Sequence, residues 1–225
     1  MNEFLFLLLF LSLASITLLA LKLGKSYLLA LVATFSVLMN IFVLKPFDLF
    51  GITTYGGNAI YACIFLSTDL LAEYFGKKEA LKAVKVSFLT LLTYFLVSII
   101  YLKINPNLEV EGAGEVQNAL EVIFSPALGI AIASLAAFLS SNTFDIYFYD
   151  FIRGKTGQKL LWLRNNLSTM ISQFLDTLIF TLIASLCGIF SWSIFWEVIL
   201  FAYLFKIAIA FLDTPFIYLA KLVRK

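Results

Sequence analysis

The sequence predicts an all-α integral membrane protein, and three observations lead to this fold class. Of the 225 residues, 62% are hydrophobic and only 13% are charged, and the mean hydropathy is +0.98. A soluble domain of this length needs more charged side chains to cover its surface. The apolar residues also fall into runs of about 20, the length that an α-helix needs to cross the hydrocarbon core of a bilayer.

Seven such runs are expected to form spanning helices. In chain order they cover approximately residues 4–21, 26–44, 52–75, 86–102, 120–150, 166–190 and 195–220. Only Lys22-Leu23-Gly24-Lys25 separates the first two runs, which suits a tight helical hairpin. The fifth run is longer than a bilayer requires, so it is expected to tilt or to project beyond the membrane. Because no linker is visible, we expect a single transmembrane domain over residues 1–225.

The charged residues between these runs predict an orientation. Segment 76–85 holds four lysines and one glutamate, and segment 151–165 holds two arginines, two lysines and no acid. The C-terminal tail is also basic, whereas segment 103–121 carries one lysine and four glutamates. Basic loops stay in the cytoplasm. Counting seven helices places all three basic segments on one side, so the N-terminus is expected outside and the C-terminus in the cytoplasm.

Six charged residues remain inside the predicted helices, namely Asp69, Glu73, Asp145, Asp176, Lys206 and Asp213. Each costs roughly 2.5–3.5 kcal/mol at mid-bilayer, so each needs a partner, a water-filled cavity or a function. At 100° per residue they lie on stripes that also carry aromatic and polar side chains. On the third run, the stripe contains Asn58, Tyr61, Phe65, Asp69 and Glu73. We expect the stripes of four helices to converge on one interior site.

Depth and spacing predict specific pairs. With a rise of 1.5 Å per residue, Asp176 and Lys206 both lie near the middle of the membrane and are expected to pair. Glu73 precedes Lys77 by one turn and is expected to form an interfacial pair with it. For Asp213, bonding to backbone groups freed by Pro215 is an alternative to a binding role. A structural hydrogen-bond network is the corresponding alternative for the other buried acids.

Several kinds of chemistry find no support in this sequence. The chain has no histidine, and its two cysteines lack metal-ligand spacing, so no metal site is expected. No cofactor motif, nucleophile–base pair or phosphate-binding loop is present, which argues against an enzyme; any use of ATP must come from a partner. A net charge of +2 argues against a nucleic-acid partner. Carboxylates and amides among aromatic faces suit a small polar or cationic solute, such as a flat heteroaromatic molecule with N–H donors.

Four motifs carry a resemblance to a known family. STDLLAEYFGKKEA, SSNTFDIYFYDFIRGKTG, LWLRNNLSTMISQFLDTLIF and YLFKIAIAFLDTPFIYL resemble the landmarks of the queuosine precursor transporter family, also called the vitamin uptake transporter family. The resemblance runs from about Tyr27 to the C-terminus. It implies a six-helix transporter core over residues 26–225, with residues 1–25 as an additional N-terminal helix. It also implies uptake of 7-deazaguanines (preQ0, preQ1 or queuine) across the bacterial inner membrane for tRNA modification, without a cofactor.

The family's motif positions coincide with the intramembrane charges. The resemblance and the charge pattern together predict a substrate site of Asp69, Asp145, Gln173, Asp176, Lys206, Asn58 and Phe65. Rim or gating residues are expected to be Glu73, Asn166 and Asp213. In this scheme Asp176 and one further acid face the N–H edge of the base, while Gln173 binds its carbonyl and Lys206 neutralises the acids of the empty site.

Several alternatives stay open. The family also resembles the substrate-binding components of energy-coupling-factor transporters, so a coupling module or a homodimer is a further expected partner besides the lipid bilayer. Transport of another vitamin-like solute, or a scaffold role in the membrane, is the alternative function.

Overall fold

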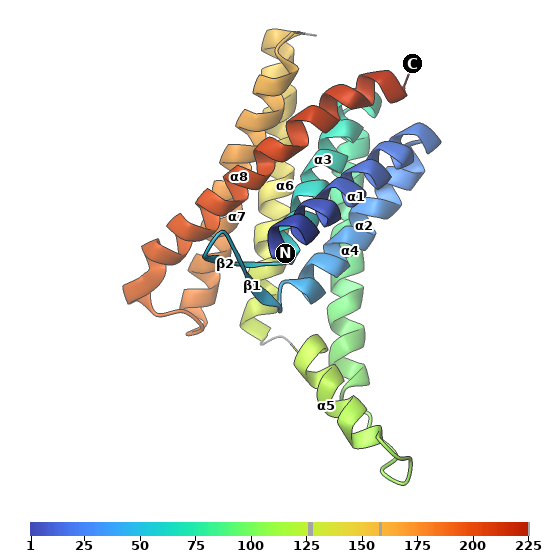
Figure 1. Ribbon diagram of the computed structural model, residues 1–225, viewed down its shortest axis with the longest axis vertical. Coiled ribbons are helices and arrows are strands. Elements are labelled where there is room, and N and C mark those ends of the chain that lie inside the picture. The colour runs from blue at the N-terminus through green and yellow to red at the C-terminus, as the bar shows by residue number, and fades with distance from the viewer. Residues whose placement is uncertain (126–127, 158, 225) are drawn as a thin grey trace.

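The computed structural model describes residues 1–125, 128–157 and 159–224 and shows a helical bundle (Figure 1). The helices are α1 (Asn2–Leu23), α2 (Lys25–Phe42), α3 (Gly57–Phe75), α4 (Lys77–Tyr101), α5 (Ala113–Phe124), α6 (Leu128–Thr156), α7 (Leu161–Leu186) and α8 (Phe195–Val223), with a short 3₁₀ turn at Trp192–Ile194. Within the described residues, six helices are long and apolar enough to cross a membrane, namely α1, α2, α4, α6, α7 and the segment containing α8. The predicted class, an all-α polytopic membrane protein, is confirmed.

Helix α3 is the central helix of the bundle and differs from the six apolar ones. Fifteen of its 19 residues are buried. It packs against α1, α2, α4, α6 and α8. A helix that is buried on all sides is surrounded by protein rather than by lipid. The polar side chains of α3, Asp69 among them, therefore face other helices whichever way they point.

A β-hairpin precedes α3, so the predicted start of the third run at residue 52 is wrong. Strands β1 (Pro46–Leu49) and β2 (Ile52–Tyr55) pair antiparallel. The two residues between them, Phe50 and Gly51, both have positive φ angles, as two-residue hairpin turns require. Threonine and isoleucine favour strands because their branched Cβ atoms fit a pleated surface. Helix α3 begins only at Gly57.

Helix boundaries also differ from the prediction around the fifth run. The predicted helix over 120–150 is two helices, because α5 ends at Phe124 and α6 begins at Leu128. Ser125 has left the helical region, as expected for the residue before a proline. Residues 126–127, which the prediction included, lie outside the described residues. Together with the end of α4, α5 projects below the rest of the bundle in Figure 1.

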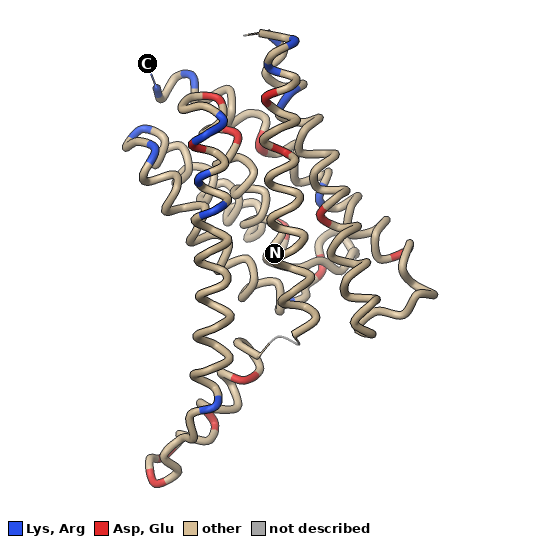
Figure 2. Tube along the Cα trace, turned by 180° about the vertical axis from the view of Figure 1, so that it is seen from behind, with Lys and Arg blue, Asp and Glu red and all other residues tan. Residues whose placement is uncertain are grey.

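Basic residues concentrate at one end of the bundle. The positions of lysines and arginines at the start of α4, the end of α6 and the end of α8 lie at the upper end in Figure 2, which we call the basic end, together with some acidic positions. The connection from α4 to α5 lies at the opposite end and carries acidic residues. Much of the predicted basic loops is helical, since α4 begins at Lys77 and α6 continues to Thr156. Gln158 and Lys225, which belong to two of the predicted basic segments, lie outside the described residues.

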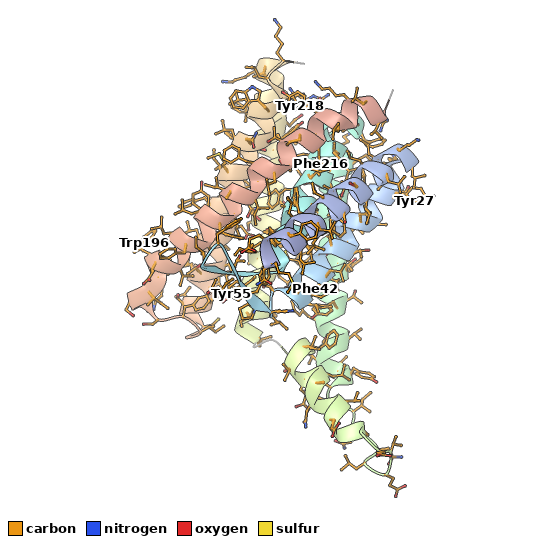
Figure 3. All side chains as sticks on the ribbon, viewed as in Figure 1. Tyr27, Phe42, Tyr55, Trp196, Phe216 and Tyr218 are labelled. Atoms are coloured by element: carbon orange, nitrogen blue, oxygen red, sulfur yellow. The ribbon has the colours of Figure 1, made fainter. Side chains whose placement is uncertain are left out.

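Close helix contacts fix the packing around α3. A Cβ atom added to Gly57 would lie 2.9 Å from the carbonyl oxygen of Met39, so only glycine permits this approach of α3 to α2. Helix α1 turns into α2 at a single residue, Gly24, which confirms the predicted tight hairpin. The buried face of α1 packs on α8, where the rings of Phe10 and Phe216 meet edge to face with their centroids 5.9 Å apart. Figure 3 labels Phe216 on α8. Helix α1 therefore contributes to the core of the bundle.

Candidate functional site

Buried polar side chains from α3, α6, α7 and α8 occupy the interior of the bundle in three layers. The Arg164 layer, nearest the basic end, contains Glu73, Tyr149 and Arg164. We group the buried polar residues between the two outer layers as the middle layer, namely Asp69, Asn142, Asp145, Asn165, Thr169, Ser172, Gln173 and Asp213; Asn142 lies near the hydroxyl of Tyr61, at the border with the Lys206 layer. The Lys206 layer contains Tyr61, Ser141, Asp176, Thr177 and Lys206. On α7 the buried polar positions run from Arg164 to Ser185, roughly 30 Å along the helix axis and about the thickness of a hydrocarbon core.

Arg164 is fully buried, and all three of its side-chain nitrogens form hydrogen bonds. Its Nη2 lies 2.6 Å from Oε1 of Glu73, and its Nε lies 3.2 Å from Oε2 of the same side chain. The hydroxyl of Tyr149 donates to Glu73 at 2.8 Å. The remaining nitrogen, Nη1, donates to two backbone carbonyls at the end of α6 and in the following loop. The Arg164 layer is thus a closed ion-pair network that joins α3, α6 and α7.

The predicted pair between Glu73 and Lys77 is wrong. Gly76, with a φ of 89°, ends α3 before Lys77, so the one-turn spacing of a continuous helix does not hold. Lys77 instead lies 3.4 Å from Asp150 on α6. Glu73 forms its ion pair with Arg164, which the sequence placed in a loop.

The Lys206 layer confirms the predicted mid-membrane pair. Lys206 Nζ lies 2.6 Å from Oδ2 of Asp176, and the hydroxyl of Tyr61 donates to Oδ1 of the same carboxylate at 2.5 Å. Ser141 donates to that oxygen at 3.1 Å. Phe65 lies against Tyr61, with ring centroids 5.1 Å apart. Asp176 is therefore satisfied by donors from α3, α6 and α8.

The middle layer is different, because its three carboxylates lack a basic partner. Asp69 is completely buried, and neither of its oxygens accepts a hydrogen bond from an N–H or hydroxyl donor of the described residues; its carboxyl group lies within hydrogen-bonding reach of the carboxyl group of Asp145. Asp145 accepts one hydrogen bond from Ser172 at 2.9 Å, and Asp213 accepts one from Asn165 at 2.9 Å. Within residues 1–125, 128–157 and 159–224, no lysine or arginine forms an ion pair with any of the three.

Unpartnered acceptors concentrate in the middle layer. Thirteen buried side-chain atoms in the described part of the chain lack a hydrogen-bond partner, and eight of them belong to this layer. These eight are both oxygens of Asp69, Oδ2 of Asp145, Oδ2 of Asp213, Oδ1 of Asn142, Oδ1 of Asn165, Oγ1 of Thr169 and Oε1 of Gln173. A buried polar atom without a partner costs about 1–3 kcal/mol. The layer therefore favours a ligand that brings several N–H donors or a positive charge.

Two predicted site residues lie apart from these layers. Asn58 donates to the hydroxyl of Thr54 at 3.1 Å and is thus tied to the β-hairpin. Asn166 donates to a carbonyl of its own helix and accepts from Thr214 at 3.1 Å, which links α7 to α8. The structure brings together the other predicted residues, but the roles assigned to them as substrate, rim or gating residues stay predictions.

Asn165 and Ser172 of α7 lie in the middle layer although the prediction did not name them, whereas Thr169 lies on one of the predicted polar stripes without being named as a site residue. Asn165, Thr169 and Ser172 repeat at intervals of four and three residues, the spacing that places side chains on one helix face. A predicted start at residue 166 excluded Asn165 and Arg164 from the helix. Had the polar spacing been followed upstream, it would have extended the helix and included both residues.

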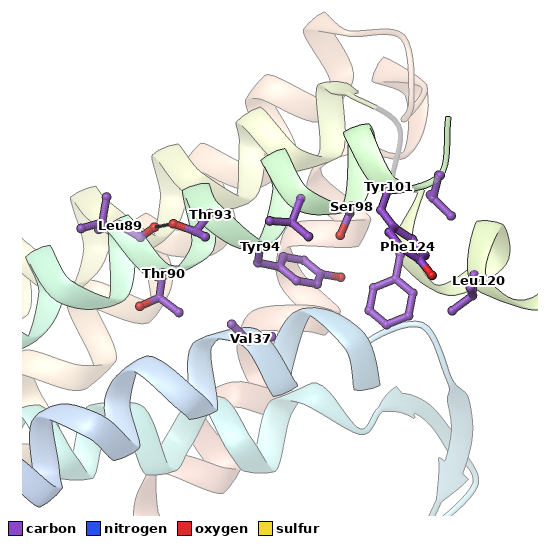
Figure 4. A pocket seen from close by; sticks show the side chains of 11 residues that line it. Val37, Leu89, Thr90, Thr93, Tyr94, Ser98, Tyr101, Leu120 and Phe124 are labelled. Carbon is purple, nitrogen blue, oxygen red and sulfur yellow. Dashed lines mark hydrogen bonds between the residues drawn. The ribbon is translucent and has the colours of Figure 1, made fainter. Parts of the chain in front are cut away.

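An open groove lies elsewhere, between α2, α4 and α5. It has a volume of about 640 Å³ and is lined mainly by apolar and aromatic side chains. Figure 4 shows the rings of Tyr94 and Phe124 near Val37 in this groove. None of the predicted site residues lines it, whereas the middle layer is enclosed by packed helices.

Comparisons with known proteins show the family of this chain. The model of a family described as "Putative vitamin uptake transporter" matches residues 55–220, a range that includes all three layers. A protein of Bacillus subtilis (strain 168) with the name "Probable queuosine precursor transporter" is 40% identical over 199 residues, which are 88% of this chain and 85% of that protein. No solved structure matches the chain.

Proposed function

The chain belongs to the vitamin uptake transporter family, and we propose that it takes up a 7-deazaguanine precursor of queuosine for tRNA modification. One structural observation supports this substrate class above the others: the eight unpartnered oxygens that gather in the middle layer. The name of the relative from Bacillus subtilis points to the same class of solute.

A 7-deazaguanine complements a layer of acceptors. Its guanine-like edge presents a ring N–H beside an amino group, and a carboxylate accepts two such parallel hydrogen bonds. A carbon replaces N7 of guanine, which removes one acceptor from the ligand. In this proposal Asp69 and Asp145 accept from the N–H edge, while the amide of Gln173 binds the carbonyl of the base. Asp176 already has three donors, so its contribution is to hold Lys206 beside the site.

We further propose that the basic end faces the cytoplasm of a bacterial inner membrane, with the N-terminus outside. The concentration of lysine and arginine positions at one end supports this orientation. Movement of the solute needs no chemical conversion, so the proposal assigns no enzymatic activity. A homodimer or an energy-coupling module remains a proposed partner.

The proposal can be tested in a bacterium that neither makes queuosine precursors nor has an importer of its own. The chain is expressed in this host, preQ0, preQ1 or queuine is supplied at nanomolar concentration, and queuosine in tRNA is measured. Restoration by at least one compound is expected. Failure with all three, with the protein present in the membrane, would contradict the proposal and favour another vitamin-like solute.

A further inference from the structure

The charges inside the bundle do not balance layer by layer. The Arg164 layer pairs Glu73 with Arg164, and the Lys206 layer pairs Asp176 with Lys206. Between them, Asp69, Asp145 and Asp213 come from three different helices and have no ion-pair partner in the described part of the chain. Asp69 is within electrostatic range of both other acids. The middle of the bundle therefore holds three acidic groups without a basic partner among the described residues.

A neutral side chain near these acids, that of Thr169, also lacks a hydrogen-bond partner among the described residues. Thr169 is 2% exposed and lies one turn from Asn165, which bonds Asp213, and one turn from Ser172, which bonds Asp145. Its hydroxyl has no hydrogen-bond partner among the described residues. The buried hydroxyl of Thr177, by contrast, donates to the carbonyl one turn back on the same helix. The buried, unpartnered hydroxyl of Thr169, on the helix that also carries the partners of Asp145 and Asp213, is a second sign of a ligand there.

We propose, on the premise of the function proposed above, that the middle layer selects 7-deazaguanines that carry a protonated amine. A primary ammonium brings one positive charge and three N–H donors. It thus supplies both the charge and the hydrogen bonds that this layer lacks. A nitrile at the same position of the base offers only an acceptor, which would face other acceptors.

A consequence of this selection is that transport moves charge. The carboxylates belong to the protein, so each cationic substrate adds one positive charge to the side that receives it. A membrane potential of 100 mV, negative inside, then favours accumulation of a monovalent cation by roughly 40-fold. A neutral substrate gains nothing from the same potential.

The test uses the full chain, purified and reconstituted into liposomes. Uptake of 7-aminomethyl-7-deazaguanine is compared with uptake of 7-cyano-7-deazaguanine, with and without a potential set by potassium and valinomycin. The amine compound is expected to enter at least about tenfold faster and to accumulate only when the interior is negative. Substitution Asp69→Asn should reduce this preference. Substitution Glu111→Gln, which removes an exposed acid beyond the end of α4, should retain it.

The wild-type measurements keep the inference separate from the function on which it rests. Equal rates for the two compounds, or accumulation of the amine compound that ignores the potential, would overturn the inference and leave the function standing. Absence of uptake for both compounds, and for queuine measured in the same liposomes, would overturn the function itself.

Discussion

Both the outer layers and the middle layer of the bundle contain buried carboxylates, but only those of the outer layers have basic partners among the described residues. In the Arg164 and Lys206 layers, each carboxylate has a basic partner at 2.6 Å and further donors from neighbouring helices. In the middle layer, three carboxylates share two hydrogen bonds from neutral side chains. Paired charges hold helices together, whereas unpaired buried acceptors are costly unless something else supplies their partners.

This difference predicts that the outer layers contribute mainly to the stability of the fold and the middle layer mainly to binding of the substrate. Removing a partner in an outer layer leaves a buried charge alone and should weaken the fold. Removing a charge from the middle layer eliminates an unpaired group, so the fold should hold while transport fails. The four predictions below therefore differ in which quantity changes.

The largest effect on stability is expected from Arg164→Met. Because Glu73 would remain buried without a counter-charge, the free energy of unfolding should fall by about 3–5 kcal/mol. Thermal unfolding in detergent measures this change. The matched control is Arg153→Ala, since Arg153 is 29% exposed and lies 3.9 Å from Glu73, and a loss below about 1 kcal/mol is expected. Equal losses of unfolding free energy for Arg164→Met and Arg153→Ala would contradict the expectation that the buried partner of Glu73 matters more than the partly exposed one.

A smaller loss of stability is expected from Lys206→Met. Asp176 would keep its hydrogen bonds from Tyr61 and Ser141, and the pair is slightly exposed, so we expect a loss of about 2 kcal/mol. Adding Asp176→Asn removes the unpaired charge and should recover part of the loss. A double variant that is less stable than Lys206→Met alone would contradict the pairing.

For Asp69→Asn, uptake rather than stability should change. A hydrogen bond to a charged group is worth about 1.5–3 kcal/mol, so uptake of substrate should fall roughly 10- to 100-fold. Thermal stability should stay equal or rise, because a buried carboxylate without a partner is removed. Normal uptake by a folded variant would exclude Asp69 from the site.

The smallest effect is expected from Thr169→Val, which keeps the shape of the side chain and removes the hydroxyl. Loss of one neutral hydrogen bond to the ligand costs about 1 kcal/mol, so the apparent affinity for substrate should weaken by roughly fivefold. The matched control is Thr177→Val, whose hydroxyl has a backbone partner and a contact with Lys206. A change of stability without a change of affinity in Thr169→Val would assign this hydroxyl to the fold alone.

Helical geometry explains which parts of this picture the sequence predicts. The rise and rotation per residue determine depth and direction, so the pairing of Asp176 with Lys206 and the convergence of Asp69 and Asp145 on the interior follow from position alone. The partner of Glu73 does not follow, because it depends on where α3 ends at Gly76 and where α7 begins. The β-hairpin before α3 was also missed, since four residues of strand are too short to separate from a long apolar run.

Whether each buried acid has a hydrogen-bond donor cannot be predicted from the sequence of its own helix. Whether Asp69 finds a donor depends on the rotation of α6, α7 and α8 around α3, and those rotations result from packing among all four helices. The sequence thus identifies candidate residues for the site, while the structure distinguishes those that already have partners from those that do not.

The most direct test of the central claim, that the middle layer binds the substrate, is the thermal stability of purified protein with and without a 7-deazaguanine. At a concentration 100 times the dissociation constant, a ligand that binds only the folded state adds about 2.7 kcal/mol. Wild-type protein and Arg153→Ala should both gain several degrees in unfolding temperature, whereas Asp69→Asn should gain little. A folded Asp69→Asn variant that is stabilised as strongly as the wild type would contradict the claim.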